Sequence, residues 1–180
     1  MKIFNIDKNF KNVPKINEKF NLCLGFFDGI HLGHRKIIAA ASKNGNKIGI
    51  ITFVRKNNVE KYITPINERL DFFKKLNISF VFVLPFSKKI MNISHFFFKK
   101  NFLDVIKPTI LFAGEDFKFG KNRLGNIEYL KKFFSVKVIK FKKKNNEKIS
   151  SSKIKEMIRF YHYMDFIKFF LKKRAKKNFF

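Results

Sequence analysis

The stretch from Gly25 to His34, with the sequence GFFDGIHLGH, constrains the fold of this chain more than any other feature. It follows an apolar run, Phe20 to Leu24, and leads into a segment with helical apolar spacing, Lys36 to Ala41. This order indicates a strand, a glycine-rich turn and a helix. Glycines let the backbone approach a phosphate closely, and a helix N-terminus attracts anions through its free N–H groups. Two histidines at that N-terminus could donate hydrogen bonds to a phosphoryl group, so the stretch predicts a nucleotide-phosphate site.

Short apolar runs alternate with helical patterns along most of the chain. The predicted strands are Phe20–Phe26, Lys47–Phe53, Phe80–Leu84, Thr109–Ala113 and Val136–Phe141. The predicted helices are Gly33–Lys43, Asn67–Leu76, Ser94–Val105 and Asn126–Phe133. Several strands are continuous apolar runs, as expected of parallel strands that are covered on both faces. The alternation predicts an α/β fold with an open, parallel, five-stranded sheet and flanking helices.

Polar segments follow the predicted strands, at the edge where such sheets bind their ligands. They are Asp28–His34, Val54–Thr64, the glycine-rich segment Gly114–Gly125 and the serine-containing segment Lys148–Lys155. The serines of the last segment begin an apolar-periodic helix, where hydroxyls either cap the helix or donate to a phosphate. Alone, the serine run favours capping. The phosphate role gains support because the HxGH turn is expected on the same side of the sheet.

The chain carries 40 Lys+Arg against 13 Asp+Glu, a formal net charge of +27. Such a charge is typical of nucleic-acid or anionic-membrane binders, and also of a lysine-rich solvated surface. The lysines are spread along the whole chain without an RNA-binding signature, and abundant Phe, Lys, Asn and Ile suggest an AT-rich coding bias. We therefore expect a solvated surface and no specific nucleic-acid partner.

Cys23 is the single cysteine and lies in a predicted buried strand, so we expect a core residue rather than a nucleophile. His95 and His162 lack a motif and are expected to be packing or surface residues. The N-terminus lacks the apolar core of a signal peptide, and no segment approaches the length of a membrane span. We expect a cytoplasmic protein. The sequence does not determine the oligomeric state.

Four segments, in order, carry a resemblance to a known family: GFFDGIHLGH at 25–34, ITF at 51–53, GEDFKFG at 114–120 and ISSSKIK at 149–155. Together they resemble the FAD synthetase module, the FMN adenylyltransferase half of bacterial bifunctional riboflavin kinase/FAD synthetases. The similarity extends from Leu22 to Ile158. It implies a Rossmann-like nucleotidyltransferase fold and the transfer of AMP from ATP to FMN, giving FAD and pyrophosphate with Mg²⁺. The FMN phosphate oxygen would attack the α-phosphorus in line, so catalysis would consist of positioning and charge stabilisation.

The resemblance implies site residues one by one. The implied catalytic residues are His31, His34 and Lys155, of which the histidines would hold the ATP phosphates. The other implied ATP-binding residues are Gly25, Phe26, Phe27, Asp28, Gly29, Gly33, Gly114, Asp116, Ser151 and Ser152. The implied FMN-binding residues are Phe53, Asp116, Phe117, Asn122 and Arg123. The metal ligands stay unknown.

The chain departs from the family pattern at three places. Thr52-Phe53 is followed by Val54-Arg55-Lys56-Asn57, where the family has an aspartate-proline-histidine-proline-like run on the flavin and metal side. Lys155 replaces an arginine, which keeps the charge and loses the bidentate fork. A short basic, aromatic tail takes the place of the riboflavin kinase domain, so we expect a domain at 1–160, a helix or tail at 161–180, and no riboflavin phosphorylation.

Two alternatives to FMN adenylylation stay open. The altered 54–57 segment leaves room for a nucleotidyltransferase with another phosphate acceptor, such as phosphopantetheine or a sugar or polyol phosphate. The same change, together with the high charge, leaves room for a non-catalytic protein that binds flavin, nucleotide or nucleic acid.

Overall fold

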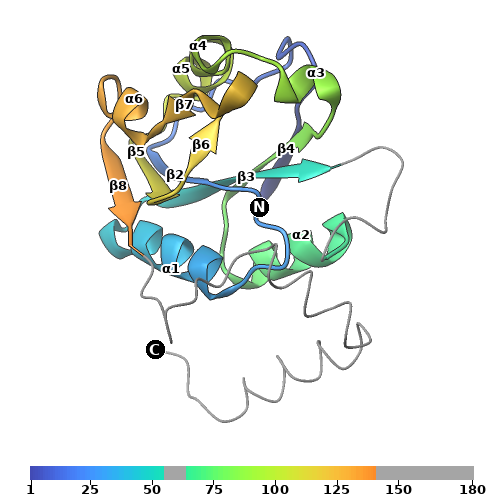
Figure 1. The fold of residues 1–180 in the computed structure, drawn as a ribbon. Helices are drawn as coiled ribbons and strands as arrows, with labels where there is room; N and C mark the ends of the chain where they lie inside the picture. The colour runs from blue at the N-terminus through green and yellow to red at the C-terminus, as the bar shows by residue number, and fades with distance from the viewer. Residues whose placement is uncertain (55–63, 141–180) are drawn as a thin grey trace, which may run out of the picture.

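The computed structural model describes residues 1–54 and 64–140, and its centre is a sheet of six strands (Figure 1). In spatial order these are β1 (Lys2–Asn5), β4 (Phe80–Pro85), β3 (Lys47–Val54), β2 (Phe20–Leu24), β5 (Ile110–Gly114) and β8 (Val136–Ile139). Every pairing in this sheet is parallel. The chain runs outward from β2 through β3 to β4, and then returns to the other side of β2 to form β5 and β8.

The interior strands are buried on both faces. All five residues of β2 are buried. Phe20, Leu22 and Leu24 belong to one core cluster and Cys23 to the other, as the twofold alternation of a strand requires. Because neither face meets water, these strands appear in the sequence as continuous apolar runs.

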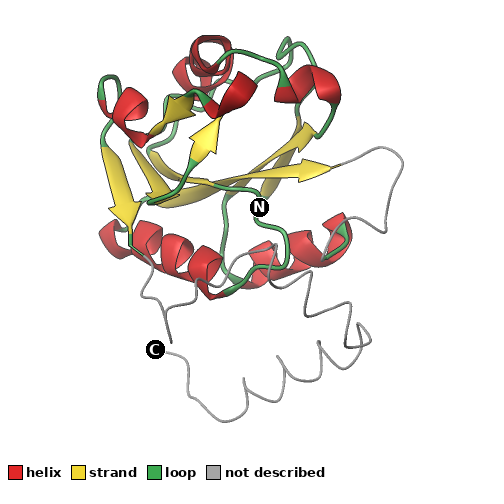
Figure 2. Cartoon of the chain, viewed as in Figure 1, coloured by secondary structure: helices red, strands yellow, loops and turns green. Residues whose placement is uncertain are grey.

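Two helices cover one face of the sheet (Figure 2). They are α1 (Leu32–Ala41), which is followed by the short turn η1 (Ser42–Asn44), and α2 (Ile66–Lys75). Ile37 and Ile38 of α1 and Phe73 of α2 share a core cluster with Val81 and Phe112 of the sheet. These helices thus bury their apolar residues against the face that carries Cys23.

Shorter elements cover the other face. These are α3 (Lys88–Met91), α4 (His95–Phe98), the π-helical turn η3 (Lys99–Leu103), α5 (Asp104–Ile106), the turn η4 (Lys121–Arg123) and α6 (Ile127–Lys131), with a small antiparallel hairpin of β6 (Lys118–Phe119) and β7 (Gly125–Asn126). Phenylalanine supplies much of this core. Phe102 is fully buried and stands edge-on to Phe82 of β4, with ring centroids 5.5 Å apart.

The predicted α/β class and parallel sheet are confirmed, but the predicted number of five strands was wrong. The sixth strand, β1, lies at the edge of the sheet beside β4, and three of its four residues are exposed. An exposed edge strand has no continuous apolar run, so the pattern that identified the interior strands could not identify this one.

Several predicted boundaries also differ. The strand predicted over Phe20–Phe26 ends at Leu24, and the strand predicted over Val136–Phe141 ends at Ile139. The helix predicted over Ser94–Val105 consists of α4, η3 and α5. The predicted tail, 161–180, lies outside the described residues.

Candidate active site

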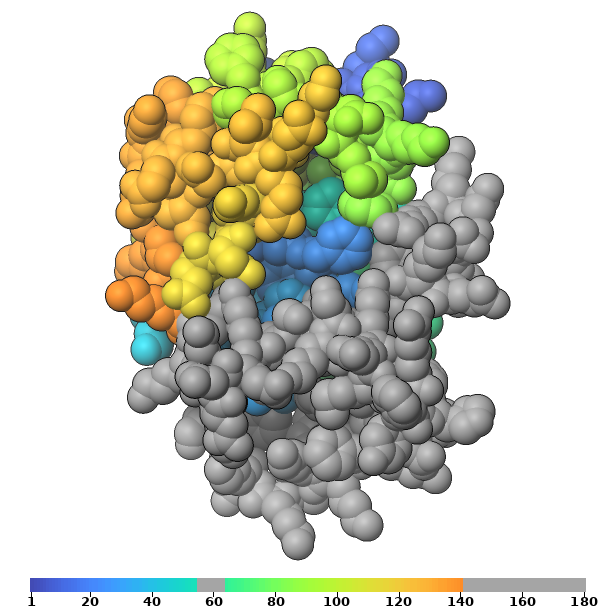
Figure 3. All heavy atoms as spheres, in the orientation of Figure 1, coloured from blue at the N-terminus to red at the C-terminus, as the bar shows by residue number. Residues whose placement is uncertain are grey.

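The turn after β2 lies where the progression of the chain across the sheet reverses. β2 pairs with β3 on one side and with β5 on the other, with Leu24 opposite Ala113. The carboxyl ends of the three strands therefore meet, and buried Gly114 ends β5 beside the turn. Open parallel sheets bind ligands at such a switch point. In the space-filling view, blue residues of the early chain come to the surface below the yellow and orange residues of the opposite layer (Figure 3).

The backbone of this turn is strained. Phe27, Gly29 and Ile30 all have a positive φ, at 49°, 75° and 35°. Only glycine adopts that region freely, and each other residue there costs about 1–3 kcal/mol. The Phe27 and Ile30 side chains are buried in the core beneath the sheet, and this burial holds the strained backbone in place. Gly25 is required because a Cβ there would lie 2.9 Å from the Phe27 ring.

His31 is the N-cap of α1. Its Nδ1 accepts a hydrogen bond from the Gly33 amide at 3.2 Å. Because an accepting imidazole nitrogen carries no proton, neutral His31 holds its proton on Nε2, which is then a hydrogen-bond donor. The helix start also bears the partial positive charge of the helix dipole, and the first turn of α1 contains no acidic residue. This end of the helix is therefore suited to an anion.

His34 stacks on His31 one turn into the helix. The two rings lie 3.7 Å apart between centroids at an interplanar angle of 23°, and both residues are buried. The His34 ring also contacts the ring of Phe27, at 4.7 Å. Burial, reinforced by the neighbouring His31, lowers the pKa of His34 to about 2. His34 is therefore a neutral imidazole, and its buried Nδ1 has no hydrogen-bond partner among the described residues.

Aromatic side chains gather at the carboxyl ends of β2, β3 and β4. Phe26 stacks on Phe53, with centroids 5.0 Å apart, and Phe86 stands edge-on to Phe26 at 5.2 Å. All three are half-buried. Phe53, which was predicted to bind FMN, therefore lies against the turn after β2. The segment that follows, 55–63, includes most of the altered stretch and lies outside the described residues.

The glycine-rich segment after β5 forms the small hairpin of β6 and β7 with the turn η4 between them. Asp116 is exposed, and Phe117 is half-buried and stacks on Phe119 in β6. Asn122 and Arg123 are exposed in the turn between β6 and β7, both with positive φ. The binding roles of these four residues stay predictions.

Close packing against His95 explains why two positions of this segment are glycine. A Cβ at Gly120 would lie 2.7 Å from the backbone nitrogen of His95, and one at Gly125 would lie 2.7 Å from the Cβ of His95. The hairpin therefore fits closely over the start of α4. His95 also stands edge-on to Tyr129 at 4.6 Å, which confirms it as a packing residue.

The serine run and its basic neighbour, with the predicted residues Ser151, Ser152 and Lys155, lie outside the described residues. So does His162. Their predicted roles are therefore untested. Across residues 1–54 and 64–140, no group of three His, Cys, Asp or Glu side chains is arranged to hold a metal ion.

Cys23 is fully buried in β2, and burial raises the pKa of its thiol. A thiol in this state does not act as a nucleophile, so the prediction of a core residue is confirmed. In the same described ranges, none of the helices combines the length and apolar character needed to cross a membrane.

Sequence reasoning missed Arg69 beneath the turn, and it gave Thr52 no role beyond its place in the ITF motif at 51–53. Arg69 of α2 is completely buried, and it donates to the buried Thr52 at the end of β3. A signal for Arg69 was available, because it lies four residues before the buried Phe73 and therefore on the same face of the helix.

Comparisons with known proteins agree with this geometry. A family model described as FAD synthetase matches residues 13–153. A bifunctional riboflavin kinase/FMN adenylyltransferase of Buchnera aphidicola subsp. Schizaphis graminum is 32% identical over 170 residues, covering 84% of this chain and 54% of that protein. The Listeria monocytogenes protein of the same name is 29% identical over 153 residues, covering 76% and 49%. The chain thus spans about half the length of these curated relatives.

Solved structures show the same fold. A Streptococcus pneumoniae protein named as a macrolide-efflux protein matches with a TM-score of 0.73 at 25% identity, over 88% of this chain and 56% of that one. Pantoate-beta-alanine ligase from Francisella tularensis matches with a TM-score of 0.56 at 15% identity, over 86% and 73%. The second likeness is one of fold alone, and it agrees with the α/β architecture and the parallel sheet. With the family model matching most of its length, the chain belongs to the FAD synthetase family.

Proposed function

We propose that this chain transfers the AMP moiety of ATP to FMN, giving FAD and pyrophosphate, by in-line attack of an FMN phosphate oxygen on the α-phosphorus. The observation that carries the proposal is the buried, stacked pair of His31 and His34 at the start of α1, in a chain of the FAD synthetase family. The reaction needs no protein nucleophile. It needs donors fixed around a phosphoryl group whose charge is redistributed as the bonds change.

The two histidines have different tasks in this proposal. His31 donates from Nε2 to a phosphate oxygen, because its Nδ1 is occupied by the Gly33 amide. His34 stays neutral at every physiological pH, since its pKa lies near 2. It therefore enters the proposed site as a neutral hydrogen-bonding group.

The other predicted residues complete the two halves of the site. The ATP half consists of the turn itself, with Gly25, Phe26, Phe27, Asp28, Gly29 and Gly33, together with Gly114 and Asp116, and with Ser151, Ser152 and Lys155 as further phosphate contacts. The FMN half consists of Phe53, Asp116, Phe117, Asn122 and Arg123. The stacking of Phe53 on Phe26 supports this division, because it brings the two halves into contact.

Mg²⁺ is expected from the family, but the described donor set does not fit a metal held by protein side chains alone. Mg²⁺ keeps several waters and favours phosphate oxygens as ligands. We therefore assign no step to a protein-bound metal, and Mg²⁺ enters the assay together with ATP.

The test is a product assay with purified protein, ATP, Mg²⁺ and a panel of acceptors: FMN, riboflavin, phosphopantetheine, and sugar or polyol phosphates. We expect FAD and pyrophosphate in equal amounts with FMN and no product with riboflavin, which has no phosphate. Pyrophosphate release with another acceptor, and none with FMN, would replace FMN as the substrate. Folded protein that releases no pyrophosphate with any acceptor would contradict the assignment as an enzyme.

A further inference from the structure

Arg69 carries a charge, and among the described residues it has the largest of the fully buried side chains. It belongs to α2, beneath the sheet, and none of its surface is exposed. A buried guanidinium is costly unless its N–H groups are hydrogen-bonded. Two of its bonds lead to the end of β3: Nη1 donates to the Thr52 hydroxyl at 2.7 Å, and Nη2 donates to the Phe53 carbonyl at 3.0 Å.

The Thr52 hydroxyl connects Arg69 to the turn after β2 through a second hydrogen bond. Arginine has no acceptor atom, so the Thr52 oxygen must accept from Arg69. The hydroxyl proton is then available for the Phe26 carbonyl, which lies 3.2 Å away. Arg69, Thr52 and the Phe26 carbonyl thus form one directed chain of hydrogen bonds from α2 through β3 to the turn.

A second bond ties the turn to the start of the same helix. The Thr64 amide, two residues before α2, donates to Oδ1 of the buried Asp28 at 3.1 Å. Phe26 and Asp28 flank Phe27, whose φ of 49° is one of the strained angles of the turn. The strained residue is therefore held by hydrogen bonds on both sides, and the histidines follow it in the chain four and seven residues later.

The same arginine also reaches the acceptor side. It holds the carbonyl of Phe53, and the Phe53 ring stacks on the ring of Phe26. Arg69 thus contacts one residue of each half of the proposed site, either directly or through Thr52, while it is itself sealed from solvent.

We propose that Arg69 is a positioning residue: acting through Thr52 and the Phe53 carbonyl, it fixes the relative placement of the histidine turn and the acceptor-side aromatic residue. This inference rests on the proposed FMN adenylylation. Because misplacement of reacting groups affects the transition state more than ground-state binding, loss of Arg69 lowers kcat more than it raises the KM for ATP.

The test combines two pairs of variants. We expect Arg69→Met to lower kcat by about 10- to 100-fold, with the KM for ATP changed by less than about threefold. Arg69→Lys can donate to one acceptor well but lacks the planar fork, so it recovers part of the loss. Thr52→Val lowers kcat and Thr52→Ser restores it. The double variant Arg69→Met/Thr52→Val is no slower than Arg69→Met alone, because both changes break the same chain of bonds.

Asn21 provides a matched control at the opposite edge of the sheet. It is also buried and polar, and its side chain donates to the Ala41 carbonyl at 2.7 Å and to the Asn44 side chain at 2.6 Å. Asn21→Leu breaks a buried polar network far along β2 from the turn. We expect it to lower the denaturation midpoint while leaving kcat per folded molecule unchanged.

Hydrogen exchange of the turn amides provides a readout that needs no activity. We expect Arg69→Met to speed exchange over 25–33, and Asn21→Leu to leave it unchanged. Equal exchange in the two variants, or a kcat of folded Arg69→Met equal to that of the wild type, would overturn the positioning role. If wild-type protein forms no FAD, the proposed function fails, and the exchange comparison alone then decides whether Arg69 positions the turn. If Arg69→Met does not fold, the Thr52 pair decides in its place.

Discussion

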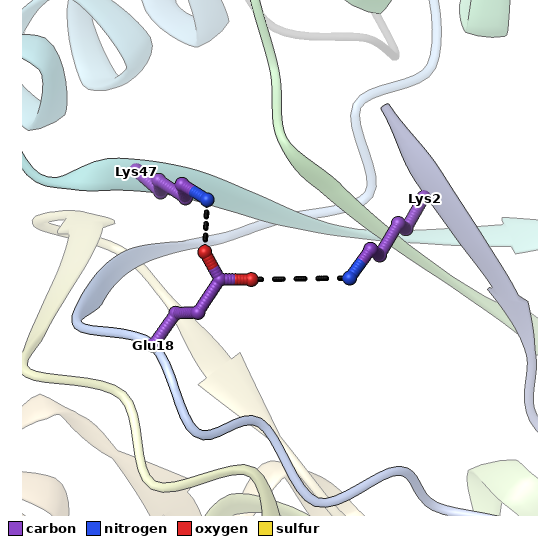
Figure 4. Close-up of polar contacts among 3 residues, drawn as sticks. All are labelled: Lys2, Glu18 and Lys47. Carbon is purple, nitrogen blue, oxygen red and sulfur yellow. Dashed lines mark hydrogen bonds and ion pairs between the residues drawn. The ribbon is translucent and has the colours of Figure 1, made fainter.

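Polar side chains lie both at the amino edge of the sheet, where its parallel strands begin, and at the carboxyl edge, where they end. Their surroundings differ between the two. At the amino edge, a surface hollow of about 410 Å³ is lined by Lys2, Glu18, Lys47 and their neighbours. Glu18 bonds to Lys47 and lies 3.9 Å from Lys2, with all three side chains exposed (Figure 4). The hydrogen bond from Lys47 lowers the pKa of Glu18. Lys2, Glu18 and Lys47 therefore meet one another in water.

At the carboxyl edge, the polar groups are buried and fixed. His31 and His34 are buried and stacked on each other, and the turn before them is strained. The buried Arg69 is connected to this turn by hydrogen bonds through Thr52. Strain and buried polar groups reduce stability, so they persist where the surrounding structure imposes them. The ion-paired side chains that line the hollow at the amino edge have none of these features. The identifying marks of the candidate site are an accepting His31 Nδ1, a neutral His34 and a backbone held in a disfavoured conformation.

The largest effect that separates the two edges is expected from the histidines. His31→Ala and His34→Ala should each lower the rate of FAD formation by about 100- to 1,000-fold, because each removes a fixed donor or acceptor from a dry site. The measurement is kcat together with the denaturation midpoint. His95→Ala, which removes a packing imidazole at α4, is the control and should keep the wild-type rate. Full activity in both motif variants would remove the pair from the mechanism.

Substitutions at two glycines, one at each edge, test whether only the carboxyl edge controls the reaction. Gly25→Ala places a Cβ 2.9 Å from the buried Phe27 ring, so the turn must shift, and we expect kcat to fall by about tenfold. Gly45→Ala lies before β3 at the amino edge, with a φ of 73° and open space around the new Cβ. That change should cost about 1 kcal/mol of stability and leave kcat unchanged. Equal kinetic effects at both glycines would mean that the turn geometry does not control the reaction.

The stability of the fold should depend on pH through His34. Its pKa falls from 6.5 in the unfolded chain to about 2 in the folded one, so between these values the unfolded chain binds the extra proton. Stability is fully present above pH 6.5 and is lost as the pH decreases, by up to about 1.4 kcal/mol per pH unit. Urea denaturation between pH 7 and 5 measures the slope. His34→Gln should flatten it, and an unchanged slope in that variant would place the titration elsewhere.

The smallest effect is expected at the amino edge. Glu18→Gln removes an ion pair between exposed side chains, whose contribution is screened by water and salt. We expect the melting temperature and the rate of FAD formation to match the wild type within error. A large loss of activity in this variant would show that the hollow at this edge takes part in function.

Much of the fold was accessible from the sequence because buried parallel strands have a simple pattern. β2, β3, β4, β5 and β8 were all found from apolar runs, and the switch point followed from their alternation with helices. β1 was missed because it is an exposed edge strand of four residues. The elements α3, β6 and β7 are only two to four residues long, too short for any periodicity to be evident.

The site was accessible only in part. The HxGH motif located His31 and His34 at the start of α1, where the structure has them. The positive φ of Phe27 and Ile30 could not be predicted, because the intrinsic preference of both residues is against it and only tertiary packing imposes it. Arg69 was not singled out in the sequence INERLDFFKK, although its spacing from Phe73 indicated a shared buried face.

The central claim is that AMP is transferred at the carboxyl edge, and following the α-phosphorus of ATP tests it most directly. Wild-type protein, FMN and Mg²⁺ are incubated with ATP radiolabelled at the α-phosphorus, and in parallel with ATP labelled at the γ-phosphorus. We predict that the α label appears in FAD and the γ label in pyrophosphate, and that His34→Ala slows the appearance of both by about 100- to 1,000-fold. Release of the γ label as orthophosphate, with no label in FAD, would contradict adenylyl transfer and the account built on it.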